Sequence, residues 1–214
     1  MRKYHMKADT FFSEGEKHRI EETINIIESR TIGEVAVMVV DSSDRYREAE
    51  VLGGLFLGSL LALVLALSLF HASIWAYIIC SFLFFFPSRY LFQQFPALHA
   101  GFVGLKRKEV TVMQRALIAF YEKELYKTKK NTGVLFFISL FERKVWVLAD
   151  KGICEKIDQE TLKGFAHMVS EGIKEGRACD ALCRAIRETG EILATHFPIA
   201  PGDTDELPDK VITE

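Results

Sequence analysis

The longest uncharged stretch of the chain limits its possible folds more than any other feature. Residues 51–88 contain no Asp, Glu, Lys or Arg, which is 38 consecutive positions in a chain of 214. One membrane crossing needs roughly 20 apolar residues, whereas a single helix of this length would rise about 57 Å at 1.5 Å per residue. The stretch is therefore too long for one crossing and long enough for two.

Polar residues near the middle of the stretch divide it into two predicted transmembrane helices. The break is His71-Ala72-Ser73, so the first helix covers residues 51–70 and the second begins at 74 and ends between 91 and 95. Pro87 is expected to kink the second helix near its end, and Arg89 can extend to the membrane interface. The alternative is a buried hairpin of a soluble protein, but the rest of the chain is too small to cover it. Aromatic residues lie near the expected boundaries, as in an aromatic belt: Trp75, Tyr77 and Tyr90.

Charge on either side of the hairpin predicts its orientation. The turn at residues 71–73 contains no Lys or Arg. The positive-inside rule places the flanks in the cytoplasm and the turn outside. The soluble part then lies at the cytoplasmic face of a bacterial-type inner membrane, and the lipid bilayer, including its anionic headgroups, is the first predicted partner. The basic flanking residues are Arg45, Arg47, Arg89, Lys106, Arg107 and Lys108.

A second stretch, residues 131–153, predicts a β-hairpin. It reads NTGVLFFISLFERKVWVLADKGI, with apolar runs at 133–140 and 144–149 joined by Phe141-Glu142-Arg143. Continuous apolar runs are typical of strands covered on both faces. The link is too short for a crossover helix, so the pair should be antiparallel. We expect these strands in the middle of a sheet with helices on both sides.

The remaining periodic segments complete an α/β fold. The Ser13-Glu14-Gly15-Glu16 capping box begins a helix that extends to about residue 30, and residues 33–40 predict a buried strand. Further helices are predicted over about 108–127, 158–176 and 180–197, and the tail from 198 is expected on the surface. The predicted architecture is an α/β/α sandwich with a small mixed sheet, interrupted by an inserted transmembrane helical hairpin. Its parts are residues 1–50, the hairpin at 51–96, and residues 97–214.

Composition excludes some classes of function. The formal net charge of −2 gives no case for nucleic-acid binding, which needs a basic face. Cys80, Cys154, Cys179 and Cys183 form no CxxC pair, so reduced thiols of a cytosolic compartment are expected rather than a metal site. The polar N-terminus predicts no signal peptide.

Acidic side chains follow two of the predicted strands and form the candidate metal site. Asp41 and Asp44 follow the first strand, and Asp150 follows the third. If those strands run parallel, the carboxylates would meet at the same edge and hold Ca²⁺ or Mg²⁺, which could activate water or polarise a phosphoryl oxygen. The alternative, which we favour, is that each Asp ends a strand or caps a helix. Other polar residues near element ends are Glu34, Asn131 and Asp158.

Several catalytic signatures do not occur in the sequence. There is no GxSxG, HExxH, Walker A loop or Rossmann glycine run. The six histidines show no ligand spacing, and Cys154 has no neighbouring His that would activate it as a nucleophile. The sequence therefore does not identify a reaction.

The stretch at residues 131–153 resembles the core of the TPM-domain family, also called TPM phosphatases. Three other stretches resemble the same family: the strand entry TIGEV at 31–35, Gly176-Arg177 with Gly190-Glu191, and His196-Phe197-Pro198 with ELPD at 206–209. The loop with Asp150 and Gly152 matches the family's strand-end motif. Departures are Ala149 in place of Gly, an inserted Thr132, Asp205 in place of Asn, and the membrane hairpin itself.

The resemblance implies an α/β/α sandwich and two kinds of function. Family members have been linked to acid phosphatase activity, to divalent metal binding, and to non-catalytic assembly or repair of membrane complexes. We therefore weigh two hypotheses. The preferred one is a non-enzymatic, membrane-anchored binding or assembly module that serves a membrane protein complex. The alternative is a divalent-metal-assisted phosphatase, with Asp150 as the principal ligand and Asp41 or Asp44 assisting.

Overall fold

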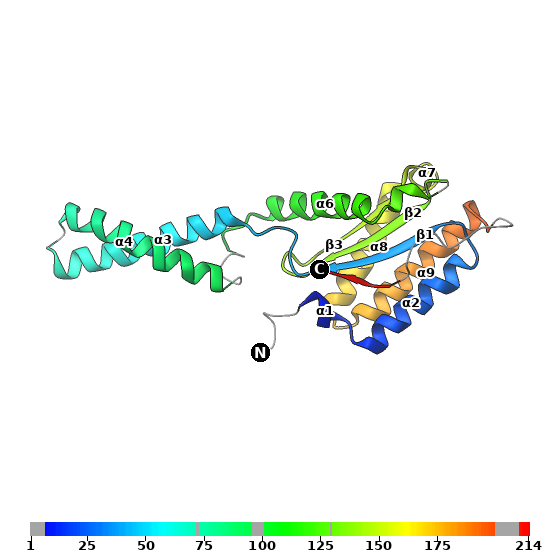
Figure 1. Cartoon of the computed structure of the whole chain (residues 1–214), viewed down its shortest axis with the longest axis horizontal. Coiled ribbons are helices and arrows are strands. Elements are labelled where there is room, and N and C mark those ends of the chain that lie inside the picture. Colours follow the sequence, from blue (N-terminus) through cyan, green and yellow to red (C-terminus); the bar gives the residue numbers. More distant parts are fainter. Residues whose placement is uncertain (1–6, 72, 96–100, 129, 200–209) are drawn as a thin grey trace. The chain divides into compact units, whose positions relative to one another are not determined.

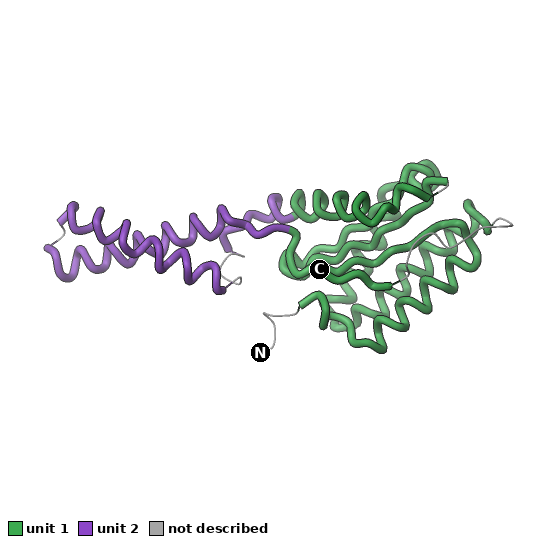
Figure 2. Tube along the Cα trace, viewed as in Figure 1, with its two compact units in different colours: residues 1–43, 109–214 green, residues 44–108 purple. Residues whose placement is uncertain are grey.

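The computed structural model describes residues 7–71, 73–95, 101–128, 130–199 and 210–214. It divides into two compact units. Unit 1 comprises residues 1–43 and 109–214, and unit 2 comprises residues 44–108 (Figures 1 and 2). Unit 2 is therefore an insertion in the sequence of unit 1, which is formed by two separate segments of the chain.

Unit 1 is built on a four-stranded mixed sheet of order β3-β2-β1-β4. The strands are β1 (Glu34–Val40), β2 (Gly133–Ser139), β3 (Lys144–Ala149) and β4 (Ile212–Thr213). β2 pairs parallel to β1 and antiparallel to β3, which confirms the predicted hairpin. The hairpin does not form the middle of the sheet, however, because β1 and β2 are central and β3 is an edge strand. This part of the sequence prediction was wrong.

Helices cover both faces of the sheet, which confirms the predicted α/β/α sandwich (Figure 1). One face packs against α2 (Glu14–Glu28), α8 (Gln159–Lys174) and α9 (Ala178–His196). The predicted capping box of α2 is present, with the Ser13 hydroxyl accepting from the Glu16 amide. Odd-numbered residues of β1, such as Val37, and even-numbered residues of β2, such as Phe136, point to this face.

The other face of the sheet is covered by α6 (Leu105–Glu122). Its inward side chains, Val112, Ala116 and Phe120, pack against Met38 and Phe137. A single helix covers less of a sheet than three do. Three residues that pack against this core are accordingly only partly buried: Trp146, Leu148 and Ile212.

Four short elements were not anticipated from the sequence. They are α1 (Ala8–Phe11), the 3₁₀ helix η1 (Leu125–Lys127), α7 (Lys151–Cys154) and β4. β4 runs parallel to β1, with Met38 opposite Ile212, so the end of the predicted surface tail is part of the sheet. The middle of that tail, residues 200–209, lies outside the described residues.

Unit 2 is a helical hairpin of α3 (Arg47–Leu69) and α4 (Ile74–Gln94). By length and composition alone, both helices could cross a membrane. At 1.5 Å per residue they would span about 34 and 32 Å, against roughly 30 Å for a hydrocarbon core. Pro87 lies inside α4. Large apolar side chains such as Leu55, Phe82 and Leu83 are exposed along the hairpin.

Glycines in α3 allow the two helices to approach closely. A Cβ added to Gly58 would lie 3.0 Å from the backbone nitrogen of Phe85, and one added to Gly54 would lie 2.9 Å from the Arg89 Cα. Small residues at helix interfaces are typical of membrane helices, which associate through close backbone packing. The hydroxyls of Ser59 and Tyr77 also form a hydrogen bond of 2.8 Å across the hairpin.

We expect Gly58→Leu to force α3 and α4 apart, because the obstacle is α4 backbone that cannot rotate away. Helix separations vary between about 8 and 10 Å with the side chains at the contact. In a cysteine-free background, spin labels at Leu52 and Leu91 should therefore report a distance longer by about 2 Å. Gly101→Leu is the control, because a Cβ there has no atom within 4 Å. An unchanged distance in the Gly58 variant would contradict the close packing.

Candidate functional site

Two aspartates of the predicted metal site, Asp41 and Asp150, lie at opposite ends of the sheet. β1 and β3 run in opposite directions, because β2 is parallel to one and antiparallel to the other. Asp41 therefore follows the end of the sheet where Val40 pairs with Ser139. Asp150 lies at the opposite end, where its amide donates to the Gly133 carbonyl at 2.9 Å. At about 3.3 Å per residue these ends are roughly 23 Å apart. The condition for one shared edge, that the first and third strands run parallel, is therefore not met.

Each of these aspartates has a local structural partner instead. Asp41 accepts from the amide of Ala8 at 2.5 Å, at the start of α1. Asp44 belongs to unit 2, where its carboxylate pairs with Arg107 at 3.2 Å and accepts from the Arg45 amide at 2.7 Å. Asp150 caps α7 by accepting from the Lys151 amide at 2.6 Å. Asp41 and Asp150 therefore contact helix starts, and Asp44 forms an ion pair.

Four motif residues do gather at one end of the sheet. Glu34 begins β1 opposite Gly133, and Asp150 follows β3. Asn131 adopts a left-handed conformation with φ of 56° in the turn before β2. A Cβ on Gly152 would lie 2.7 Å from the Asn131 carbonyl oxygen, so only glycine allows α7 to approach this turn. The geometry gives Asn131 and Gly152 structural roles.

Glu34 and Asp150 are the two carboxylates of this group. Glu34 begins a strand whose even-numbered residues face α6, and β2 lies between β1 and β3, so the two residues lie about 10 Å apart. Direct ligation of one Ca²⁺ needs oxygens within about 2.6 Å of the ion. The Asp150 Oδ2 atom is buried without a hydrogen-bond partner among the described residues. In those same residues, no three His, Cys, Asp or Glu side chains are placed to hold a metal ion.

Cys154 lies beside Asp150 and has a raised thiol pKa. Partial burial of its sulfur is the main cause, and the negative charge of Asp150 is the second. The Cys154 thiol contacts the Ala149 carbonyl oxygen at 3.3 Å. A raised pKa lowers the thiolate fraction near neutral pH, which is the opposite of what a nucleophilic cysteine needs. Cys179, which is buried on α9, likewise has its pKa raised to about 12 by burial and by Cys183.

We expect Asp150→Asn to speed the alkylation of Cys154 at pH 8. Removing the negative charge lowers the thiol pKa and raises the thiolate fraction, while Asn still caps α7. The rate of iodoacetamide labelling at Cys154, followed by peptide mass, measures this effect. Asp158→Asn is the control, since Asp158 caps α8 through Thr161 and does not act on Cys154. A slower or unchanged rate in Asp150→Asn would contradict the assignment.

The opposite end of the sheet contains a buried carboxylate that sequence analysis missed. Glu142, in the β2–β3 turn, accepts from the Ser139 hydroxyl and from the Ser43 amide at 3.1 Å. The Ser42 hydroxyl donates to it at 3.3 Å, and the Ser43 hydroxyl donates to Ser139 at 2.9 Å. These bonds tie the turn to the segment that leaves β1 for unit 2. A Glu between two apolar runs is typical of an exposed turn, so its sequence position did not indicate burial.

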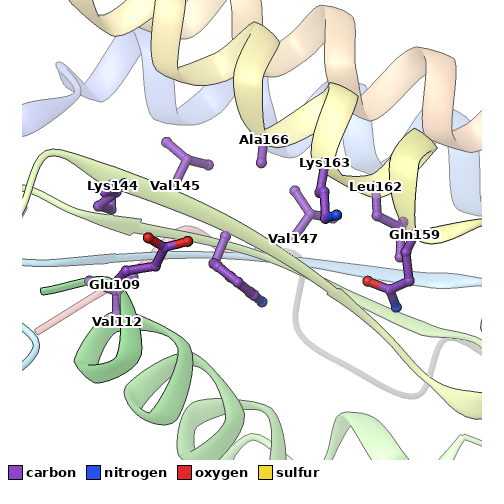
Figure 3. Close-up of a pocket in the computed structure, with 10 residues that line it drawn as sticks. Glu109, Val112, Lys144, Val145, Val147, Gln159, Leu162, Lys163 and Ala166 are labelled. Atoms are coloured by element: carbon purple, nitrogen blue, oxygen red, sulfur yellow. The ribbon is translucent and has the colours of Figure 1, made fainter. Parts of the chain in front are cut away.

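A small cavity of about 180 Å³ lies beside the edge strand β3. Val145 and Val147 point toward α8, whereas Glu109 and Val112 come from α6 (Figure 3). Pockets for small molecules usually measure about 300–1,000 Å³. This cavity is smaller, and one of its two lysines, Lys163, pairs with Glu160 at 2.6 Å. Its size and lining give no support for a substrate site.

Comparisons with known proteins establish the fold. No family model matches the sequence, and no curated protein matches it. A solved structure does match: the NMR structure of BA42 protein from the psychrophilic bacterium Bizionia argentinensis. It is 18% identical, with a TM-score of 0.59 over 94% of this chain and 94% of that chain. At this identity the likeness shows a shared fold and nothing of activity. Membership of the TPM-domain family stays a prediction from the sequence motifs.

Proposed function

We propose that this protein is a membrane-anchored binding or assembly module without catalytic activity of its own. In this proposal α3 and α4 cross the membrane, and unit 1 lies at the cytoplasmic face of a bacterial-type inner membrane. There it binds, or helps to assemble, a membrane protein complex.

One observation carries the proposal. The hairpin exposes large apolar side chains along both helices, while unit 1 has its own core on each face of its sheet. A soluble monomer rarely exposes apolar surface on this scale, because each exposed apolar side chain loses the free energy of burial. In a membrane, the lipid would bury the apolar side chains of the hairpin. The basic flanks and the uncharged turn support cytoplasmic placement of unit 1.

A metal-assisted phosphatase receives less support from the geometry. That hypothesis depends on Asp41, Asp44 and Asp150 sharing an ion, and Asp41 and Asp150 lie at opposite ends of the sheet. The contacts of Asp150 are those of a helix cap. We therefore do not propose Ca²⁺ or Mg²⁺ as a cofactor.

Two measurements test the proposal. Full-length protein should remain in the membrane pellet through alkaline carbonate washing, and gentle solubilisation should release it in a discrete complex larger than its own mass. Purified protein in lipid nanodiscs should not hydrolyse p-nitrophenyl phosphate above the rate of an Asp150→Asn variant in Mg²⁺ or Ca²⁺. Release by carbonate would contradict the anchor. Migration as a lone chain would contradict the assembly role, and hydrolysis that Asp150→Asn abolishes would restore the phosphatase.

A further inference from the structure

The outward face of α6 is apolar although it does not contact the core of unit 1. Its residues repeat at helical spacing on the side opposite Val112, Ala116 and Phe120. Their exposed fractions lie between 37% and 57%. A helix with apolar residues on both faces usually has a partner on both. We call this surface the outer α6 face, and it consists of Val110, Met113, Leu117, Ile118 and Tyr121.

Aromatic side chains extend the outer α6 face toward η1. The rings of Tyr121 and Tyr126 lie 5.2 Å apart, and both residues are exposed. Tyrosine is enriched where a protein meets the membrane–water interface, because its ring is apolar and its hydroxyl is polar. The face therefore has an apolar middle and an amphipathic end.

The segment that contains α6 has a charge opposite to that of the rest of the chain. Residues 105–130 contain eight Lys or Arg and three Glu, a formal net of +5, whereas the whole chain has −2 and the remainder therefore −7. Glu214 pairs with Lys123 at 3.2 Å and also with Arg115, and Arg107 pairs with Asp44 and Glu48. These pairs lower the local excess without removing it. Seven of the eight basic residues precede or follow the middle of α6 in sequence, and Arg115 lies within it. Basic residues of interfacial helices are attracted to anionic lipid.

The chain also limits how far α6 can lie from the membrane. α6 begins at Leu105, eleven positions after Gln94 ends α4. Eleven residues span at most about 40 Å when fully extended. If α4 ends at the cytoplasmic interface, the start of α6 stays within reach of the same surface.

We propose that α6 lies along the anionic surface of the membrane, with the outer α6 face in the headgroup region. This inference rests on the proposed membrane anchor, and it adds a surface of unit 1 that contacts the bilayer. Apolar burial and attraction of the basic residues to anionic headgroups act together, as they do for interfacial helices. Contact along α6 would fix the orientation of unit 1 and leave the α2, α8 and α9 side facing the cytoplasm.

The test uses full-length protein in nanodiscs of mixed phosphatidylcholine and phosphatidylglycerol. Single spin labels are placed at Leu117, at Phe82 in α4 as the marker of insertion, and at Ile26 in α2 as the matched control. Ile26 is 55% exposed, close to the 47% of Leu117, but lies on the other side of the sheet. Collision rates with oxygen report lipid, and those with an aqueous nickel complex report water.

We expect frequent collisions with oxygen, which report lipid, at Leu117 and Phe82. At Ile26 we expect frequent collisions with the nickel complex, which report water. In discs of phosphatidylcholine alone, the equilibrium constant for lipid contact at Leu117 should fall about fivefold. This is the factor by which one basic residue near an anionic surface favours binding. Unchanged contact there would overturn the electrostatic part. If the label at Leu117 collides with the nickel complex while the label at Phe82 collides with oxygen, the inference is overturned but the anchor is not. The outer α6 face would then be assigned to contact with a protein. An aqueous Phe82 would overturn the anchor itself.

Discussion

Replacing residues 44–108 with a flexible linker should move the protein from the membrane to the soluble fraction while leaving unit 1 folded. Ser43 and Glu109 both belong to unit 1, and a linker of about ten residues spans roughly 18 Å on average. The shortened chain keeps all four strands, the helices α2, α8 and α9, and residues 109–122 of α6, so every residue of both core clusters remains. No single substitution removes as much apolar surface as this deletion does.

Two readouts decide this prediction. After a wash at high ionic strength, which screens contact between α6 and anionic lipid, the shortened chain should be soluble. It should also show a cooperative thermal transition. A control in which a scrambled apolar hairpin of equal length replaces residues 51–88 should stay with the membrane. Aggregation of the shortened chain, or its retention in washed membranes, would show that unit 1 depends on the hairpin for its fold.

Phe136→Ala should have the largest effect on the stability of unit 1. Phe136 is fully buried near the centre of β2, opposite Val37 on one side and Val147 on the other. Truncating a buried Phe to Ala costs about 3–5 kcal/mol, because apolar contacts are lost and a cavity remains. That is a large part of the roughly 5–15 kcal/mol that holds a typical domain folded. The melting temperature should fall by roughly 10 °C or more.

Urea unfolding of the shortened soluble chain measures this cost. Ile26→Ala is the control, because an exposed side chain usually contributes within about 0.5 kcal/mol. If Phe136→Ala were as mild as Ile26→Ala, the packing of β2 against α2, α8 and α9 would be contradicted.

Local patterns in the sequence were enough to predict most elements. The capping box at Ser13, the apolar runs of the β-hairpin and the long uncharged stretch all depend on residues close together in the chain. The fold class followed from their order. Short elements such as α7 and β4 were missed because two to four residues show no periodicity.

The positions of the aspartates at the sheet ends depend on pairing between distant segments. A short link shows that β2 and β3 are antiparallel, but the direction of β1 depends on pairing across about 90 residues or more, as between Glu34 and Gly133. The shared site was conditional on β1 and β3 running parallel, and their opposite directions separate Asp41 from Asp150. Glu142 was missed because burial of a turn residue depends on Ser42 and Ser43, which come from a distant segment.

Cysteine labelling in oriented membranes tests most directly whether the hairpin anchors unit 1 at the cytoplasmic face. Cys154 is an exposed thiol of unit 1, and Ser73→Cys places a second thiol at the turn between α3 and α4. With a membrane-impermeant maleimide, intact right-side-out vesicles should show labelling of the thiol introduced at the turn and leave Cys154 unlabelled until they are opened. Labelling of Cys154 in sealed vesicles, or equal labelling of both sites, would contradict the account.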